Sequence, residues 1–163
     1  MAGMVEYLAV AADSGGSMEL RDSVTAVAGK GLEGDRYAEQ RGFYSSTPSP
    51  GGGRELTLTE AEVLEALLAE HGISLGPAEH RRNVTTRGIA LNELIGKRFS
   101  LGDVVCEGVR LCEPCEHLAG LTGKAVVAPL VHRGGLRVNI LVGGVIRVGD
   151  AITVLSPAET RAG

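Results

Sequence analysis

Short apolar runs, separated by glycine-containing turns, recur along most of the chain. Val24 and Ala26 alternate with Thr25, for example, and this two-residue period is typical of a strand with one buried face. The pattern predicts strands over Met4–Ala11, Ser23–Ala28, Glu55–Leu58, Arg98–Leu101, Val104–Val109, Leu136–Val142, Val145–Val148 and Ala151–Leu155. The pair Gly143-Gly144, which separates two of these runs, is a signal for a tight hairpin.

One segment has the period of a helix instead. Between Thr59 and Gly72, leucine and valine recur at spacings that place them on one helix face: Val63, Leu64, Leu67 and Leu68. Thr59, with Glu62 three residues later, fits a capping box, and Gly72 is a suitable stop. Leu91–Ile95 is predicted to form a short helical turn, and Leu118–Val131 is ambiguous between an interrupted helix and other structure.

Many short strands with a single firm helix predict a mainly β fold with a few helices (α+β), built as a closed or partly closed β-barrel. The 24 glycines, about twice the usual share, agree with many tight turns. The length of 163 residues fits one domain, 1–163, with a core at about 22–156. Residues 37–53, rich in serine, proline and glycine, are predicted to be a mobile loop, either a lid over a site or a tolerated insertion.

The charge balance narrows the class of protein. Lys and Arg number 16 against 20 Asp and Glu, a net charge of −4, which argues against a nucleic-acid or membrane-surface binder. The first residues lack the pattern of a signal peptide, and no apolar run approaches the ~20 residues of a membrane span. Three cysteines do not make a disulfide framework, so free thiols and a cytoplasmic location are expected.

Two motifs with polar or glycine-rich composition precede the cysteines in the chain. Gly29–Gly34 has the letters G-x-G-x-x-G after a strand, but no helix is predicted to open behind it, so a dinucleotide site is rejected. The run Glu79–Arg87 is a local basic cluster in an acidic chain. Two interpretations stay open: a solvated strand edge, or an anion site in which arginines grip phosphate and Asn83 and Thr85 add neutral donors.

Cys112-Glu113-Pro114-Cys115 is the sharpest chemical feature. Thiols at the start of a helical turn are more acidic than usual, which favours reactive cysteines. A zinc site needs four ligands, and the nearby Cys106 and His117 are poorly spaced for it. A thioredoxin-like site needs a βαβ context that is absent from the predicted elements. Two partly buried structural cysteines are the plain alternative. The rigid Pro114 weakens it, as does the expectation that Arg110, Arg133 and Arg137 lie near the motif in the fold.

Taken in order, several short motifs make the chain resemble a stand-alone MOSC domain, the family named after the C-terminal domain of molybdenum cofactor sulfurase. The resemblance covers roughly residues 29–155. Its motifs are Gly34-Asp35-Arg36-Tyr37, Arg54–Glu62, Arg81–Gly88, Leu94–Asp103, Cys112-Glu113-Pro114-Cys115, His132–Arg137 and Gly143–Asp150.

The resemblance implies a mostly β fold around a barrel and a site built on Cys115, which would carry sulfur as a persulfide or ligate molybdenum. Cys112 is a second candidate for the chemistry. Larger relatives reduce N-hydroxylated compounds or sulfurate the molybdenum cofactor. The sequence is too short to contain the separate pyridoxal-phosphate domain of the sulfurase. A pyridoxal-phosphate assignment would therefore be only a label inherited from the family.

By the same resemblance, the phosphate of the molybdenum cofactor would be held by arginines, and polar neighbours would complete the site. The candidate cofactor-binding residues are Arg54, Arg81, Arg82, Asn83, Thr85, Arg87, Asp35 and Arg36. Asp35 and Arg36 would lie in a loop that closes over the site.

Three hypotheses follow for the function. The first is a small enzyme or sulfur handler that binds the molybdenum cofactor, a molybdenum-dependent oxidoreductase or a sulfur-transfer protein acting on a small molecule. The second is a non-catalytic module that carries the cofactor or sulfur between partner enzymes. The short length favours a redox or sulfur-donor protein partner in both cases. The third is a zinc or purely structural domain.

Overall fold

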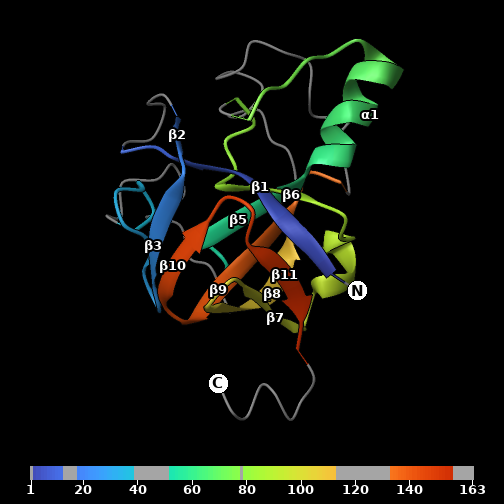
Figure 1. The fold of residues 1–163 in the computed structure, drawn as a ribbon. Coiled ribbons are helices and arrows are strands. Elements are labelled where there is room, and N and C mark those ends of the chain that lie inside the picture. Colours follow the sequence, from blue (N-terminus) through green and yellow to red (C-terminus); the bar gives the residue numbers. More distant parts are fainter. Residues whose placement is uncertain (1, 13–17, 39–51, 78, 113–132, 156–163) are drawn as a thin grey trace.

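A computed structural model gives the fold and describes residues 2–12, 18–38, 52–77, 79–112 and 133–155 (Figure 1). Several sequence predictions lie outside the described residues: most of the loop at 37–53, the ambiguous segment Leu118–Val131, and Cys115. The strands are β1 (Ala2–Val10), β2 (Glu19–Arg21), β3 (Ser23–Val27), β4 (Gly31–Leu32), β5 (Leu56–Glu60), β6 (Val84–Arg87), β7 (Arg98–Leu101), β8 (Val104–Leu111), β9 (Leu136–Val142), β10 (Gly144–Arg147) and β11 (Ala151–Val154). The helices are α1 (Ala61–His71) and the 3₁₀ turn η1 (Leu91–Leu94).

Among the described residues, seven strands close into a barrel in the order β11-β7-β8-β9-β5-β6-β1, because β1 also pairs with β11. β2 extends the sheet beyond β1, and β10, β3 and β4 form a second small sheet beside the barrel (Figure 1). The pairs are antiparallel except for β5 with β6. The predicted mainly β fold with a closed barrel is confirmed.

The barrel interior is filled by apolar side chains that alternate along the strands. In β9, Leu136, Val138 and Ile140 are buried, while the intervening Arg137 and Asn139 are partly exposed. The same alternation gives β8 its buried Val104 and Cys106. Small barrels are stabilised by such side-chain packing, so the core and the closure of the sheet support each other. The main cluster combines residues of both sheets, among them Val5, Leu8, Val24, Leu56, Leu58, Val84, Phe99, Leu101, Ile146 and Ile152.

The predicted helix is present, but its beginning differs. Thr59 belongs to β5, and the N-cap is Glu60, which makes no side-chain cap hydrogen bond. Instead of reaching back to a capping threonine, Glu62 accepts a hydrogen bond from the Gly88 amide at 2.7 Å. The capping-box prediction is therefore wrong, because Thr59 belongs to β5 and Glu62 is bonded to a residue that is distant in sequence. The predicted stop is confirmed, since Gly72 takes the left-handed conformation with φ 65°.

The predicted hairpin at Gly143-Gly144 is also wrong. β9 is hydrogen-bonded to β8 on one side and to β5 on the other, so neither edge is open to the strand that follows it. β10 pairs with β3 instead. A side chain at Gly143 would approach the Ala26 carbonyl oxygen to 2.6 Å, so the glycine allows two backbones to pass closely.

Three short strands escaped the sequence pattern: β2, β4 and β6. The Gly29–Gly34 segment contains β4, and the described residues that follow it up to 38 hold turns and no helix, as predicted. β6 lies between β5 and β1 with Val84, Thr85 and Thr86 buried, so the basic run does not form a solvated strand edge.

No helix in the described part of the chain is long and apolar enough to cross a membrane.

Candidate functional site

A buried carboxylate ties the turn after β4 to the end of β1. Asp35 is fully buried, and its Oδ1 accepts hydrogen bonds from the Ala11 amide and from Nη1 of Arg36, both at 3.1 Å. Its Oδ2 accepts from the Tyr37 amide at 3.3 Å. A buried carboxylate is stable only when it is paired and hydrogen-bonded, and Asp35 meets both conditions. Asp35 is thus a fixed anchor within the described structure.

The guanidinium of Arg36 reaches from this anchor to the residues that precede β6. Its Nη2 donates to the carbonyl oxygen of Arg81 at 3.2 Å, and its charged centre lies 5.0 Å from the ring centre of Tyr37. Arg81 is the only non-glycine among the described residues with a positive φ, 65°. Burial and the charge of Arg36 lower the pKa of Arg81. Two of the predicted cofactor-binding arginines therefore lie close together, and one of them has a strained backbone.

The side chain of Arg82 has different partners from that of Arg36. Its side chain is buried, and it donates from Nη2 to the carbonyl oxygen of Cys112 and from Nε to that of Gly134, both at 3.2 Å. The Cys112 amide in turn donates to the carbonyl oxygen of Gly135 at 2.7 Å. The basic run and the first cysteine of the Cys-x-x-Cys motif, 30 residues apart in sequence, are in direct contact.

His80 supports this contact, and the sequence analysis assigned it no role. Its Nδ1 accepts a hydrogen bond from the Arg82 amide at 3.0 Å, and its Nε2 lies 2.8 Å from Oγ1 of Thr85. Because Nδ1 is an acceptor here, Nε2 carries the proton and donates to the threonine. Burial and the nearby charge of Arg82 lower the pKa of His80 to about 3, so the ring is neutral. No periodicity or motif in the sequence marks this pairing.

Asn83, directly before β6, links β5 to β1. Its Oδ1 accepts from both the amide and Oγ1 of Thr57 at 3.2 Å, and its Nδ2 donates to the Ala9 carbonyl at 3.2 Å. Asn83 and Thr85 are close to Arg82 in the chain. The side-chain hydrogen bonds described for them go to Thr57, Ala9 and His80. Whether either residue contacts a ligand stays a prediction.

Three further arginines lie beside Cys112. Arg110 and Arg137 face each other across the β8–β9 pair, and Nη1 of Arg110 donates to the Gly52 carbonyl at 2.9 Å. Burial and the charges of Arg137 and Arg54 lower the pKa of Arg110, and the Cys112 thiol acts in the opposite direction. Arg54, predicted as a phosphate ligand, thus belongs to the same group as Arg110 and Arg137, which the sequence had placed only near the cysteines.

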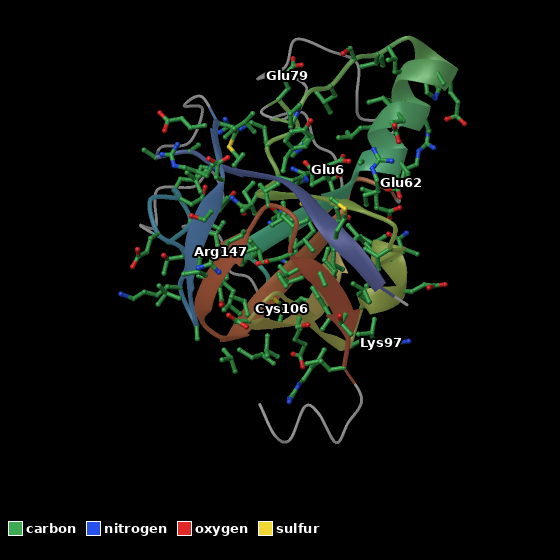
Figure 2. All side chains as sticks on the ribbon, in the orientation of Figure 1. Glu6, Glu62, Glu79, Lys97, Cys106 and Arg147 are labelled. Carbon is green, nitrogen blue, oxygen red and sulfur yellow. The ribbon has the colours of Figure 1, made fainter. Side chains whose placement is uncertain are left out.

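Arg87 lies at the far end of β6 and has different neighbours. It donates to Glu6 from Nε at 2.6 Å and to Glu65 from Nη1 at 3.1 Å. Figure 2 shows Glu6 near the first turn of α1. Arg133 likewise bonds to Glu70 of α1 at 2.9 Å. The side chains of Arg87 and Arg133 are therefore paired with carboxylates of β1 and α1.

Both cysteines in the described residues are buried free thiols. Cys106 lies inside the barrel (Figure 2), where burial raises the pKa of its thiol far above the ordinary value. Cys112 is also buried, with 1% of its surface exposed. Cys115 lies outside the described residues. Within the described ranges, no three His, Cys, Asp or Glu side chains are grouped so as to hold a metal ion.

The described residues suit an anionic group better than a bare cation. Arg36 and Arg81 meet at the start of β6, and Arg54, Arg110 and Arg137 gather next to Cys112. Clustered guanidinium groups repel one another, and a phosphate accepts hydrogen bonds from two or more of them at once. The donor set therefore fits a phosphate group.

Comparisons with known proteins show the family and the fold. A family model described as MOSC domain matches residues 46–153. The YuaD protein of Bacillus subtilis has a similar fold, with a TM-score of 0.76 and 20% identity over 94% of this chain and 96% of that one. YiiM of Escherichia coli gives a TM-score of 0.68 and 18% identity over 96% of this chain and 70% of that one. A search of curated proteins gives no match.

Proposed function

The chain belongs to the MOSC domain family, and from that premise we propose that it is a molybdenum-cofactor-associated protein that works through the thiolate of Cys115. Two activities fit this proposal: transfer of sulfur as a persulfide, and reduction of an N-hydroxylated compound with the thiolate as a metal ligand. The observation that supports it best is the group of arginines beside Cys112, three residues before Cys115.

The position of Cys112 limits where Cys115 acts. Three residues span at most about 11 Å, so the Cα of Cys115 stays within that reach of the Cα of Cys112. Arg110, two residues before Cys112, lies opposite Arg137 in the β8–β9 pair and interacts electrostatically with Arg54. Arg36 contacts the Arg81 carbonyl, and the neighbouring Arg82 contacts the Cys112 carbonyl. Positive charge near a thiol favours its thiolate, which is both the nucleophile for sulfur and a soft metal ligand.

Each residue group has a separate task in the proposal. Arg54, Arg81, Arg110 and Arg137 bind and orient the phosphate, and the Asp35–Arg36 pair fixes the turn beside them. When bound, the cofactor supplies a redox-active metal. In the sulfur-transfer form, the Cys115 thiolate attacks the outer sulfur of a donor persulfide. A new S–S bond forms, the donor's S–S bond breaks, and the donor leaves as its thiolate without net oxidation. A redox or sulfur-donor protein is then the expected partner.

Expression in a host that makes the molybdenum cofactor tests the proposal. Intact-mass spectrometry under native and denaturing conditions, with molybdenum analysis, detects a persulfide or a bound cofactor. Cys115→Ser should abolish loading, and Cys112→Ser should weaken it only partly. Cys106→Ala, which removes the core thiol, is the matched control and should load normally. Equal loading of Cys115→Ser and the unmodified protein would contradict the proposal.

The same experiment separates the enzyme from a non-catalytic carrier. Reduction of an N-hydroxylated base by loaded protein with a chemical electron donor would support an oxidoreductase. Loading without turnover, followed by release to an acceptor protein, would support the carrier module. Arg87 stays a predicted phosphate contact, and normal loading of Arg87→Gln would remove it from the site.

A further inference from the structure

β2 is an exposed strand at the edge of the large sheet. Among the described strands it pairs with β1 alone, and its three residues, Glu19, Leu20 and Arg21, are all exposed. The central Leu20 is apolar, yet 48% of its surface is accessible. An open edge of this kind is a template to which another strand can be added. The chemistry of these three residues indicates which strand fits.

The backbone of Leu20 points outward from this edge. Opposite residues in an antiparallel pair alternate between hydrogen-bonded and non-hydrogen-bonded positions. Ala9, which lies opposite Leu20, donates its amide to the Asn83 carbonyl on the other side of β1 at 2.8 Å, so Ala9 and Leu20 form a non-hydrogen-bonded pair. The amide and carbonyl of Leu20 therefore face away from β1. The carbonyl oxygen lies 3.5 Å from Nη1 of Arg21, which is long for a hydrogen bond.

The residues on the two sides of Leu20 carry opposite charges. Glu19 and Arg21 form an exposed ion pair, with 2.7 Å between Oε2 and Nη2. When a second copy of β2 is added antiparallel, with Leu20 opposite Leu20, each Glu19 lies opposite Arg21 of the other copy. The two leucines then exchange both of their outward backbone hydrogen bonds, and each charge faces an opposite one. The edge is thus complementary to itself under two-fold symmetry.

A groove beside β2 adds apolar side chains to this surface. In β1, a bulge between Val5 and Tyr7 places two consecutive side chains, Glu6 and Tyr7, on the outside of the barrel. The groove has a volume of about 410 Å³ and is lined by Glu6, Tyr7, Leu20, Arg21, Asp22 and Val148. Its three apolar residues, Tyr7, Leu20 and Val148, are all exposed. Contact with these side chains would add buried apolar area to the strand pairing.

We propose that β2 is a dimerisation edge, at which a second copy of this chain pairs antiparallel through Leu20 and is aligned by two Glu19–Arg21 pairs between the copies. Strands of three residues beside one groove are expected to bury less than the ~1,200 Å² of a standard interface, so the dimer is weak and reversible. None of these residues belongs to the proposed cofactor site, and the inference therefore stands independently of the proposed function.

Charge reversal tests the pairing. Sedimentation velocity of the natural protein, from about 10 µM to 1 mM, should show a monomer–dimer equilibrium. Glu19→Arg and Arg21→Glu each place two pairs of like charges opposite one another, so each should weaken the dimer by about tenfold or more. The double variant Glu19→Arg/Arg21→Glu restores opposite charges and should restore the dimer. The matched control is Glu107→Arg, which makes the same charge change at an exposed ion pair with Arg98 and should dimerise normally.

A symmetric cross-link tests the register. The Cα atoms of a hydrogen-bonded antiparallel pair lie about 5.5 Å apart, which is within the range of a disulfide. Mild oxidation of Leu20→Cys should therefore link two copies through position 20, as detected by peptide mass spectrometry. Ile95→Cys, at another exposed apolar position, is the control and should form no link between two copies of position 95.

Three results would each overturn the proposal. The first is a natural protein that stays monomeric over the whole concentration range, which would leave the edge to a different protein or to solvent. The second is a dimer that neither single reversal weakens, because another surface would then hold it. The third is a dimer that both reversals weaken and the double variant does not restore, because the charges would then not face each other across the two-fold axis.

Discussion

Nη2 of Arg36 lies 3.2 Å from the carbonyl oxygen of Arg81, a residue 45 positions further along the chain. The bond holds Arg81 with φ at 65°, where a side chain is disfavoured, and brings two guanidinium groups close together. Asp35 balances only part of this charge through its pair with Arg36. Strained backbone and gathered like charges destabilise the fold, and such features are concentrated at functional sites.

Replacing Arg81 by glycine should therefore separate stability from binding. Arg81→Gly relieves the left-handed strain and removes a guanidinium that burial and Arg36 disfavour, so the free energy of unfolding should rise by about 1 kcal/mol. Molybdenum-cofactor loading should fall. Urea denaturation and molybdenum analysis measure the two effects. A less stable variant with normal loading would show that Arg81 serves only the fold.

Removal of the buried carboxylate should be costly. Asp35→Ala leaves the Ala11 and Tyr37 amides and the Arg36 guanidinium without their acceptor. Breaking a buried pair in this way should lower the free energy of unfolding by about 3–5 kcal/mol in urea denaturation. The control is Glu19→Ala, whose pair with Arg21 is exposed and should contribute less than about 1 kcal/mol. Similar losses in both variants would contradict the anchoring role of Asp35.

His80 should make the protein sensitive to mild acid. Its pKa falls from 6.5 to about 3 on folding, so below pH 6.5 the unfolded chain binds a proton that the folded protein does not. The free energy of unfolding should therefore drop by about 1.4 kcal/mol for each pH unit between pH 6 and 4, and the full stability is present above pH 6.5. Urea midpoints measured at several pH values check this.

His80→Asn keeps an acceptor near the Nδ1 position but does not titrate, so the variant should lose this acid dependence. His71→Gln, at the exposed end of α1, removes a different histidine and should keep it. A His80→Asn curve parallel to that of the natural protein would show that other groups cause the acid sensitivity.

Gly135 should tolerate no side chain. Its φ of 121° is unfavourable for other residues, and a Cβ would collide with the Leu58 carbonyl oxygen beside the Cys112–Gly135 bond. Gly149→Ala is the control, because its φ of 94° is also positive but a Cβ would meet nothing within 4 Å. The control should lose about 1–2 kcal/mol from strain alone, and Gly135→Ala should lose clearly more. Equal thermal shifts would place the Leu58 contact in doubt.

Local pattern predicted much of the fold because a strand in a barrel has one buried and one exposed face. Leu136–Val142 and Arg98–Leu101 were predicted with the bounds that the structure shows. β6 was missed because it is buried on both sides and lacks alternation. The capping box failed because Glu62 found the Gly88 amide, which no local rule anticipates.

By itself, the sequence determined the mainly β class, most strands and the helix stop at Gly72. It also marked the basic run and the cysteines as candidate site residues. Only the tertiary structure decided that the sheet closes through β1 and β11, that β10 pairs with β3, and that Arg82 meets Cys112. The reason is physical. Periodicity shows which face of a helix or strand is buried. Which strands pair, and which charged side chains meet, depends on free strand edges and buried polar groups that are far apart in the sequence.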